Sequence, residues 1–74
     1  MGAVKREIER VEEMPLGAVE FWDGVPGEVL RVTASADPDG PYWEVDHITS
    51  TTGAVSGRHV FTDAIEVLGH LWAH

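Results

Sequence analysis

The chain has 74 residues, of which 43% are hydrophobic, and its formal net charge is −8. A chain of this size buries about three-fifths of its unfolded surface, so we expect one small acidic domain over residues 1–74. The negative charge argues against direct nucleic-acid binding and favours a basic partner. The sequence contains no cysteine, which excludes disulfides and thiolate chemistry.

Nothing in the sequence indicates export or membrane insertion. The first twenty residues contain several glutamates together with Lys5, Arg6 and Arg10. Such charges do not occur in the apolar segment of a signal peptide, so this stretch does not resemble one. No apolar run approaches the length of a membrane span. We therefore expect a soluble, cytoplasmic protein that contacts no membrane.

The first expected element is a helix over residues 3–14. Val4, Ile8 and Val11 recur at helical spacing and form one apolar stripe. Pro15 follows and ends the helix. The stripe is the surface that we expect to pack on the rest of the domain.

A short strand is expected next, over residues 17–22. Val19 and Phe21 fall on one side of it, which we expect to face the core. Glu20 and Trp22 then fall on the opposite, polar side. This assignment makes Trp22 an exposed aromatic residue beside a carboxylate.

Two longer strands follow, over residues 28–36 and 42–49, and both alternate between apolar and polar residues. The turn DPDGP separates them, with Pro38 and Gly40 at positions that suit a tight turn. The residues expected to face the core are Leu30, Val32, Ala34, Ala36, Trp43, Val45 and His47.

The pairing register of these two strands follows from matching their apolar faces. Ala34 then lies opposite Trp43, and Arg31 lies opposite Asp46. A three-residue loop would shift this register by one residue and require a backbone N–H from Pro41, which has none. We therefore prefer the first register.

A weak strand is expected within residues 53–61, followed by a helix that begins at Thr62. Thr62 is the expected cap of this helix. Its expected apolar stripe consists of Phe61, Ala64, Ile65, Leu68 and Trp72. The predicted fold is therefore α+β, a single antiparallel sheet of three to four strands with an N-terminal and a C-terminal helix on one face.

This order of elements is similar to that of the double-stranded-RNA-binding domain family. Members of that family hold phosphates with basic residues at the start of the last helix. The corresponding stretch here, TDAIEVL (62–68), is acidic and apolar. The resemblance covers the topology alone and implies no RNA binding.

The histidines are the candidate metal ligands. His70 and His74 lie four residues apart on the last expected helix, so both can face one ion. No third ligand is evident beyond His47 or His59, and a selective site needs more than two ligands. Histidines near a helix C-terminus also interact favourably with the helix dipole. We therefore expect no metal ligand and no cofactor, and we expect His47 to be half exposed at its strand end.

No motif indicates an enzyme. The sequence contains no nucleophile elbow, no phosphate-binding loop and no calcium loop. The chain is also too small to surround a deep substrate pocket. We therefore predict no catalytic residue.

The remaining signal is a combination of acidic and aromatic side chains on predicted polar faces, which is typical of an interaction surface. We hypothesise a non-enzymatic protein-binding module, an inhibitor or adaptor that engages a basic protein surface. A nucleic-acid-binding complex is one such partner, because spaced carboxylates can mimic phosphates as in viral and phage counter-defence proteins. The alternative is a self-associating accessory subunit, a homodimer whose acidity maintains solubility. The predicted partner-binding residues are Glu20, Trp22, Asp37, Asp39, Tyr42, Glu44 and Asp46.

Overall fold

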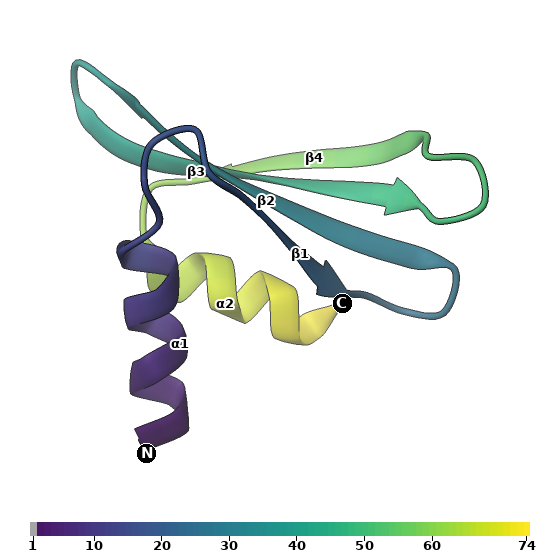
Figure 1. Ribbon diagram of the computed structural model, residues 1–74, viewed down its shortest axis with the longest axis horizontal. Coiled ribbons are helices and arrows are strands. Elements are labelled where there is room, and N and C mark those ends of the chain that lie inside the picture. The colour runs from purple at the N-terminus through teal and green to yellow at the C-terminus, as the bar shows by residue number, and fades with distance from the viewer. Residues whose placement is uncertain (1) are drawn as a thin grey trace.

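The computed structural model describes residues 2–74, with side chains from residue 5 onward. The elements are α1 (Gly2–Glu12), β1 (Val19–Asp23), β2 (Glu28–Asp37), β3 (Gly40–Thr49), β4 (Val55–Phe61) and α2 (Ala64–Ala73). The strands form one antiparallel sheet in the order β1-β2-β3-β4, with the helices on one side of it (Figure 1). The predicted α+β architecture is therefore confirmed. Over residues 2–74, neither helix has the length and apolar character needed to cross a membrane.

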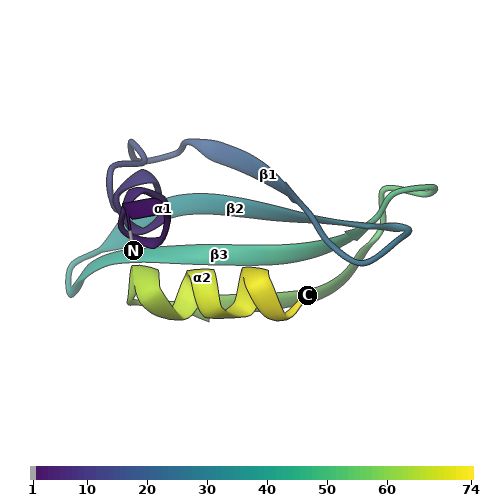
Figure 2. The ribbon, with the colours of Figure 1, turned by 90° about the horizontal axis from the view of Figure 1, so that it is seen from below.

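The two helices reach the sheet in different ways. Figure 2 shows α2 running along β3, whereas α1 is seen almost end-on beside the sheet. Trp43 of β3 donates its indole N–H to the carbonyl oxygen of Val11 at 3.2 Å, which ties the end of α1 to the sheet. Val11 is fully buried, as its place in the expected stripe required. Val4 of the same stripe lies outside the residues whose side chains are described.

The central hairpin has the predicted register. Ala34 pairs with Trp43, and Arg31 pairs with Asp46. Asp37 pairs with Gly40, so the turn contains two residues, and Gly40 adopts a φ of 134° that L side chains rarely allow. The core lies between the sheet and the helices and consists of Val11, Leu30, Val32, Ala34, Trp43, Val45, Ala64, Val67, Leu68 and Leu71.

The faces of β1 are the reverse of those predicted. Trp22 pairs with Leu30 and packs against the core, on the side covered by the helices. Arg10 of α1 explains this orientation, because its guanidinium lies 4.6 Å from the Trp22 ring centroid and its Nε lies 3.1 Å from Glu20. Phe21 is 62% exposed on the opposite face. The indole of Trp22, which is larger than the ring of Phe21, therefore contributes apolar area to the core. On the same face Glu20 forms an ion pair with Arg10.

The prediction of the cap and of the buried side of the last helix is also partly wrong. Asp63, not Thr62, is the N-cap, since its Oδ1 accepts the N–H of Ile65 at 2.8 Å. Ile65 and Trp72 are exposed, and Trp72 donates its indole N–H to Glu7 of α1 at 3.0 Å. The buried side is a different helical stripe, formed by Ala64, Val67, Leu68 and Leu71.

The orientation of β1 can be tested by comparing two aromatic substitutions. We expect Trp22→Ala to lower the free energy of unfolding by about 2 kcal/mol, below the range for fully buried aromatic residues because Trp22 is only partly buried. Phe21→Ala should change it by no more than about 0.5 kcal/mol, as at exposed positions. Urea denaturation followed by circular dichroism measures both. A larger loss for Phe21→Ala would restore the orientation predicted from the sequence.

Candidate functional site

The residues predicted to bind a partner do not gather into one surface. Glu20 and Trp22 lie on the helix-covered face, as described above. Asp37 and Asp39 are exposed at the tip of the β2–β3 hairpin. The remaining three lie on the open face of β3 and are Tyr42, Glu44 and Asp46.

Asp46 belongs to the framework of the sheet and is only 2% exposed. Arg31 and Arg58 flank it on the neighbouring strands and contact its two oxygens at 2.8 and 2.7 Å. Burial alone would raise the pKa of Asp46, but the hydrogen bonds from Arg58 and Arg31 outweigh it, so the pKa lies below its ordinary value. Its charge is neutralised within the protein.

All four histidines of the chain lie close together where the last turns of α2 approach β3 and β4. His47 comes from β3 and His59 from β4, whereas His70 belongs to α2 and His74 caps it. The ring centroid of His47 lies 5.3 Å from that of His59, 5.0 Å from that of His70 and 5.0 Å from that of His74. The fold therefore adds two histidines to the pair that the sequence spacing indicated.

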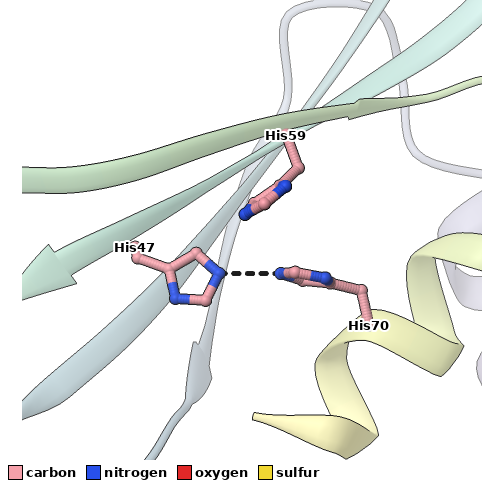
Figure 3. Close-up of side chains that lie close together, drawn as sticks. All are labelled: His47, His59 and His70. Atoms are coloured by element: carbon pink, nitrogen blue, oxygen red, sulfur yellow. Dashed lines mark hydrogen bonds between the residues drawn. The ribbon is translucent and has the colours of Figure 1, made fainter.

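Three of these side chains lie close enough together to be candidate metal ligands. Ring nitrogens of His47, His59 and His70 all lie within 4.8 Å of one another. Nε2 of His47 and Nε2 of His70 are 2.7 Å apart, and one nitrogen of His59 points toward the space beside them (Figure 3). In a tetrahedral zinc site with Zn–N bonds of about 2.0–2.1 Å, ligand nitrogens lie about 3.3 Å apart. Binding of an ion would thus require the nitrogens of His47 and His70 to move apart by about 0.6 Å.

Glu28, at the start of β2, orients His47. Its Oε1 lies 2.6 Å from Nδ1 of His47. Because a carboxylate only accepts, Nδ1 carries the proton and Nε2 is directed toward the other histidines. A carboxylate behind an imidazole ligand is a common arrangement at metal sites. His47 is also 7% exposed, so the expected half-exposed position is wrong.

The surroundings of His70 favour its neutral imidazole. Burial lowers the pKa of His70 to about 4, with further contributions from His59, His74 and His47. A neutral imidazole has a free nitrogen lone pair, the form that binds metal. Nitrogen donors of this kind suit Zn²⁺, Cu²⁺, Ni²⁺ and Co²⁺, whereas Mg²⁺ and Ca²⁺ prefer oxygen ligands.

Comparisons with known proteins give no independent guide to this site. No family model, curated protein or solved structure matches the chain. The histidine cluster and the open sheet face are therefore interpreted from their geometry.

The role of Asp46 predicts a pH-dependent loss of stability. At pH 7, Asp46→Asn should lower the free energy of unfolding by about 2 kcal/mol, the scale of hydrogen bonds to charged groups. Because the folded pKa of Asp46 lies below the ordinary 3.8, its contribution is complete above that value and disappears as the pH falls through the folded pKa. The difference between wild type and variant should therefore shrink at pH 3.

Urea denaturation at pH 7 and pH 3 measures this effect. Asp39→Asn is the matched control, since Asp39 is exposed at the hairpin tip. We expect that substitution to change stability by less than about 0.5 kcal/mol at either pH. An Asp46→Asn variant as stable as wild type at pH 7 would show that Arg31 and Arg58 do not depend on this carboxylate.

Proposed function

We propose that this protein binds a divalent transition-metal ion, with Zn²⁺ as the first candidate, through His47, His59 and His70. One observation carries the proposal: imidazole nitrogens from three separate elements lie within 4.8 Å of one another. The ligands are far apart in the sequence, so the folded state alone assembles them. Glu28 supports the same reading, because it fixes the tautomer and direction of the most buried ligand.

The short contact inside the cluster also supports metal binding. Only one proton can lie between Nε2 of His47 and Nε2 of His70, and His47 already donates through Nδ1. When His47 carries only this one proton, His70 is the donor in this contact. An arriving ion would replace that single hydrogen bond with two metal–nitrogen bonds, while His70 shifts its remaining proton to Nδ1.

Metal binding should be coupled to the stability of the fold. The ligands belong to β3, β4 and α2, and the unfolded chain holds no such preformed site. An ion that binds only the folded state stabilises it by about 2.7 kcal/mol at a concentration of 100 times Kd. A small domain with a limited core gains much from such a cross-link.

Thermal unfolding of the metal-stripped protein tests the proposal. A gain of about 2.7 kcal/mol, at roughly 4–8 °C per kcal/mol, predicts that saturating Zn²⁺ raises Tm by on the order of 10–20 °C. Mg²⁺ and Ca²⁺ should leave Tm unchanged. His59→Ala should remove most of the zinc effect, and because His59 is exposed the variant should still fold.

Two further variants sharpen this experiment. Glu28→Gln should weaken zinc affinity about 10- to 100-fold, as loss of an orienting partner does elsewhere. Val60→Ala, next to His59 but on the open face, should bind zinc like wild type. A Tm that no transition-metal ion changes would contradict the proposal.

The open face of the sheet favours a second proposal, that the protein also binds a basic protein as an inhibitor or adaptor. In the described part of the chain neither helix covers this face, which exposes 62% of Phe21, 46% of Val19 and 58% of Val60. Glu44 lies among these apolar residues and the acidic hairpin tip lies at the end of the same strand. The net charge of −8 makes a basic, cytoplasmic partner, such as a nucleic-acid-binding complex, the favoured occupant.

This second proposal predicts a specific pattern of binding losses. Phe21→Ser and Glu44→Gln should both weaken capture of a basic protein from host lysate, and raising the ionic strength should release it. Ile65→Ser is the matched control, because Ile65 is 63% exposed but lies on α2. Sedimentation of the isolated protein tests the alternative, since a salt-resistant homodimer sensitive to Phe21→Ser would replace this proposal.

A further inference from the structure

The fourth coordination position decides what a three-histidine site can do. Catalytic zinc sites keep that position for water or substrate, whereas structural sites fill it with a fourth protein ligand. The following inference rests on the metal-binding function proposed above. It concerns the role of the histidine that has no part in the three-ligand set, His74.

His74 lies next to the three ligands, outside the set whose nitrogens lie within 4.8 Å of one another. It follows His70 by four residues, so the two side chains lie on the same side of the helix one turn apart. Its ring centroid lies 4.3 Å from that of His70 and 5.0 Å from that of His47. These two separations are similar to those among the three ligands, which are 4.4 to 5.3 Å, so His74 approaches the cluster from the side of His70 and His47.

No other described side chain competes as clearly for this position. Glu28, the nearest carboxylate to His47, is engaged with Nδ1 on the far side of that ring. His74 is exposed, so its ring can turn toward the ion without disturbing the core. The sequence thus provides four imidazoles for an ion that prefers four ligands.

We propose that His74 completes a closed four-imidazole site and that the bound ion is a structural clamp, which fixes the last turn of α2 to β3 and β4. The packing of α2 explains why a clamp is useful there. Its buried residues Ala64, Val67, Leu68 and Leu71 anchor the helix as far as residue 71, and beyond them Trp72 holds it to α1 but not to the sheet. Beyond that point helix ends lose hydrogen bonds and fray unless side chains hold them. The ion supplies two ligand bonds, from His70 and His74, across this turn.

Cobalt substitution of the full chain tests the clamp, because Co²⁺ absorption reports coordination geometry and is perturbed when azide enters an open position. We expect the wild-type cobalt spectrum to be typical of tetrahedral coordination and to remain unchanged when azide is added. His74→Ala should bind Co²⁺ at least about tenfold more weakly. Removing a residue that only hydrogen-bonds to a ligand already costs this much, and His74 is proposed to be a ligand itself. The spectrum of this variant should change on addition of azide, and free imidazole should restore the wild-type form.

Hydrogen exchange supplies a second measurement on the same proteins. Zinc should slow exchange of the backbone amides of residues 70–73 in wild type and much less in His74→Ala. Ala73→Ser is the matched control, since Ala73 is exposed in the same helical turn and should leave both the spectrum and the zinc protection unchanged.

The outcomes separate the two proposals. If wild type gives no cobalt spectrum, metal binding itself is overturned and the clamp with it. If Co²⁺ binds but azide alters the wild-type spectrum, the site is open and only the clamp is overturned. The clamp also fails if His74→Ala matches wild type in azide response and in exchange protection.

Discussion

The register of the β2–β3 hairpin is the constraint on which the rest of this structure depends. Side chains alternate along a strand, so a slip of one residue would move every residue of β3 to the other face of the sheet. Asp46 would then enter the core and His47 would face solvent. The two-residue turn between Asp37 and Gly40 prevents this slip, together with the hydrogen bond that Asp37 accepts from the backbone of Asp39.

This register was predictable from the sequence because several local signals agree. Ala34 and Trp43 alternate with polar neighbours over long strands, and the DPDGP turn admits few loop lengths. β1 lacked such agreement, since Phe21 and Trp22 place an aromatic residue on each of its faces. The choice between them depends on Arg10 of α1, a contact between distant segments that alternation does not report.

The last helix and the histidine cluster show the same limit. Apolar residues surround much of α2, so Ile65 and Trp72 form as plausible a stripe as Val67 and Leu71, and only packing on the sheet selects between them. That selection also determines where His70 points. The spacing of His70 and His74 was visible in the sequence. Their closeness to His47 and His59 could not be predicted. It depends on which side of α2 faces the sheet and on the β3–β4 pairing, whose register shifts next to His47.

The two proposed functions occupy opposite faces of one thin sheet. The histidines lie on the helix side, whereas Phe21 and Glu44 lie on the open side, joined through the backbones of β3 and its neighbours. A metal ion bound at the proposed site would link β3, β4 and α2 and would thereby limit bending of the open face. A partner that requires a rigid face would then bind the metal-loaded form more tightly, and by linkage it would raise metal affinity by the same factor. Zinc would in that case both stabilise the fold and favour partner binding.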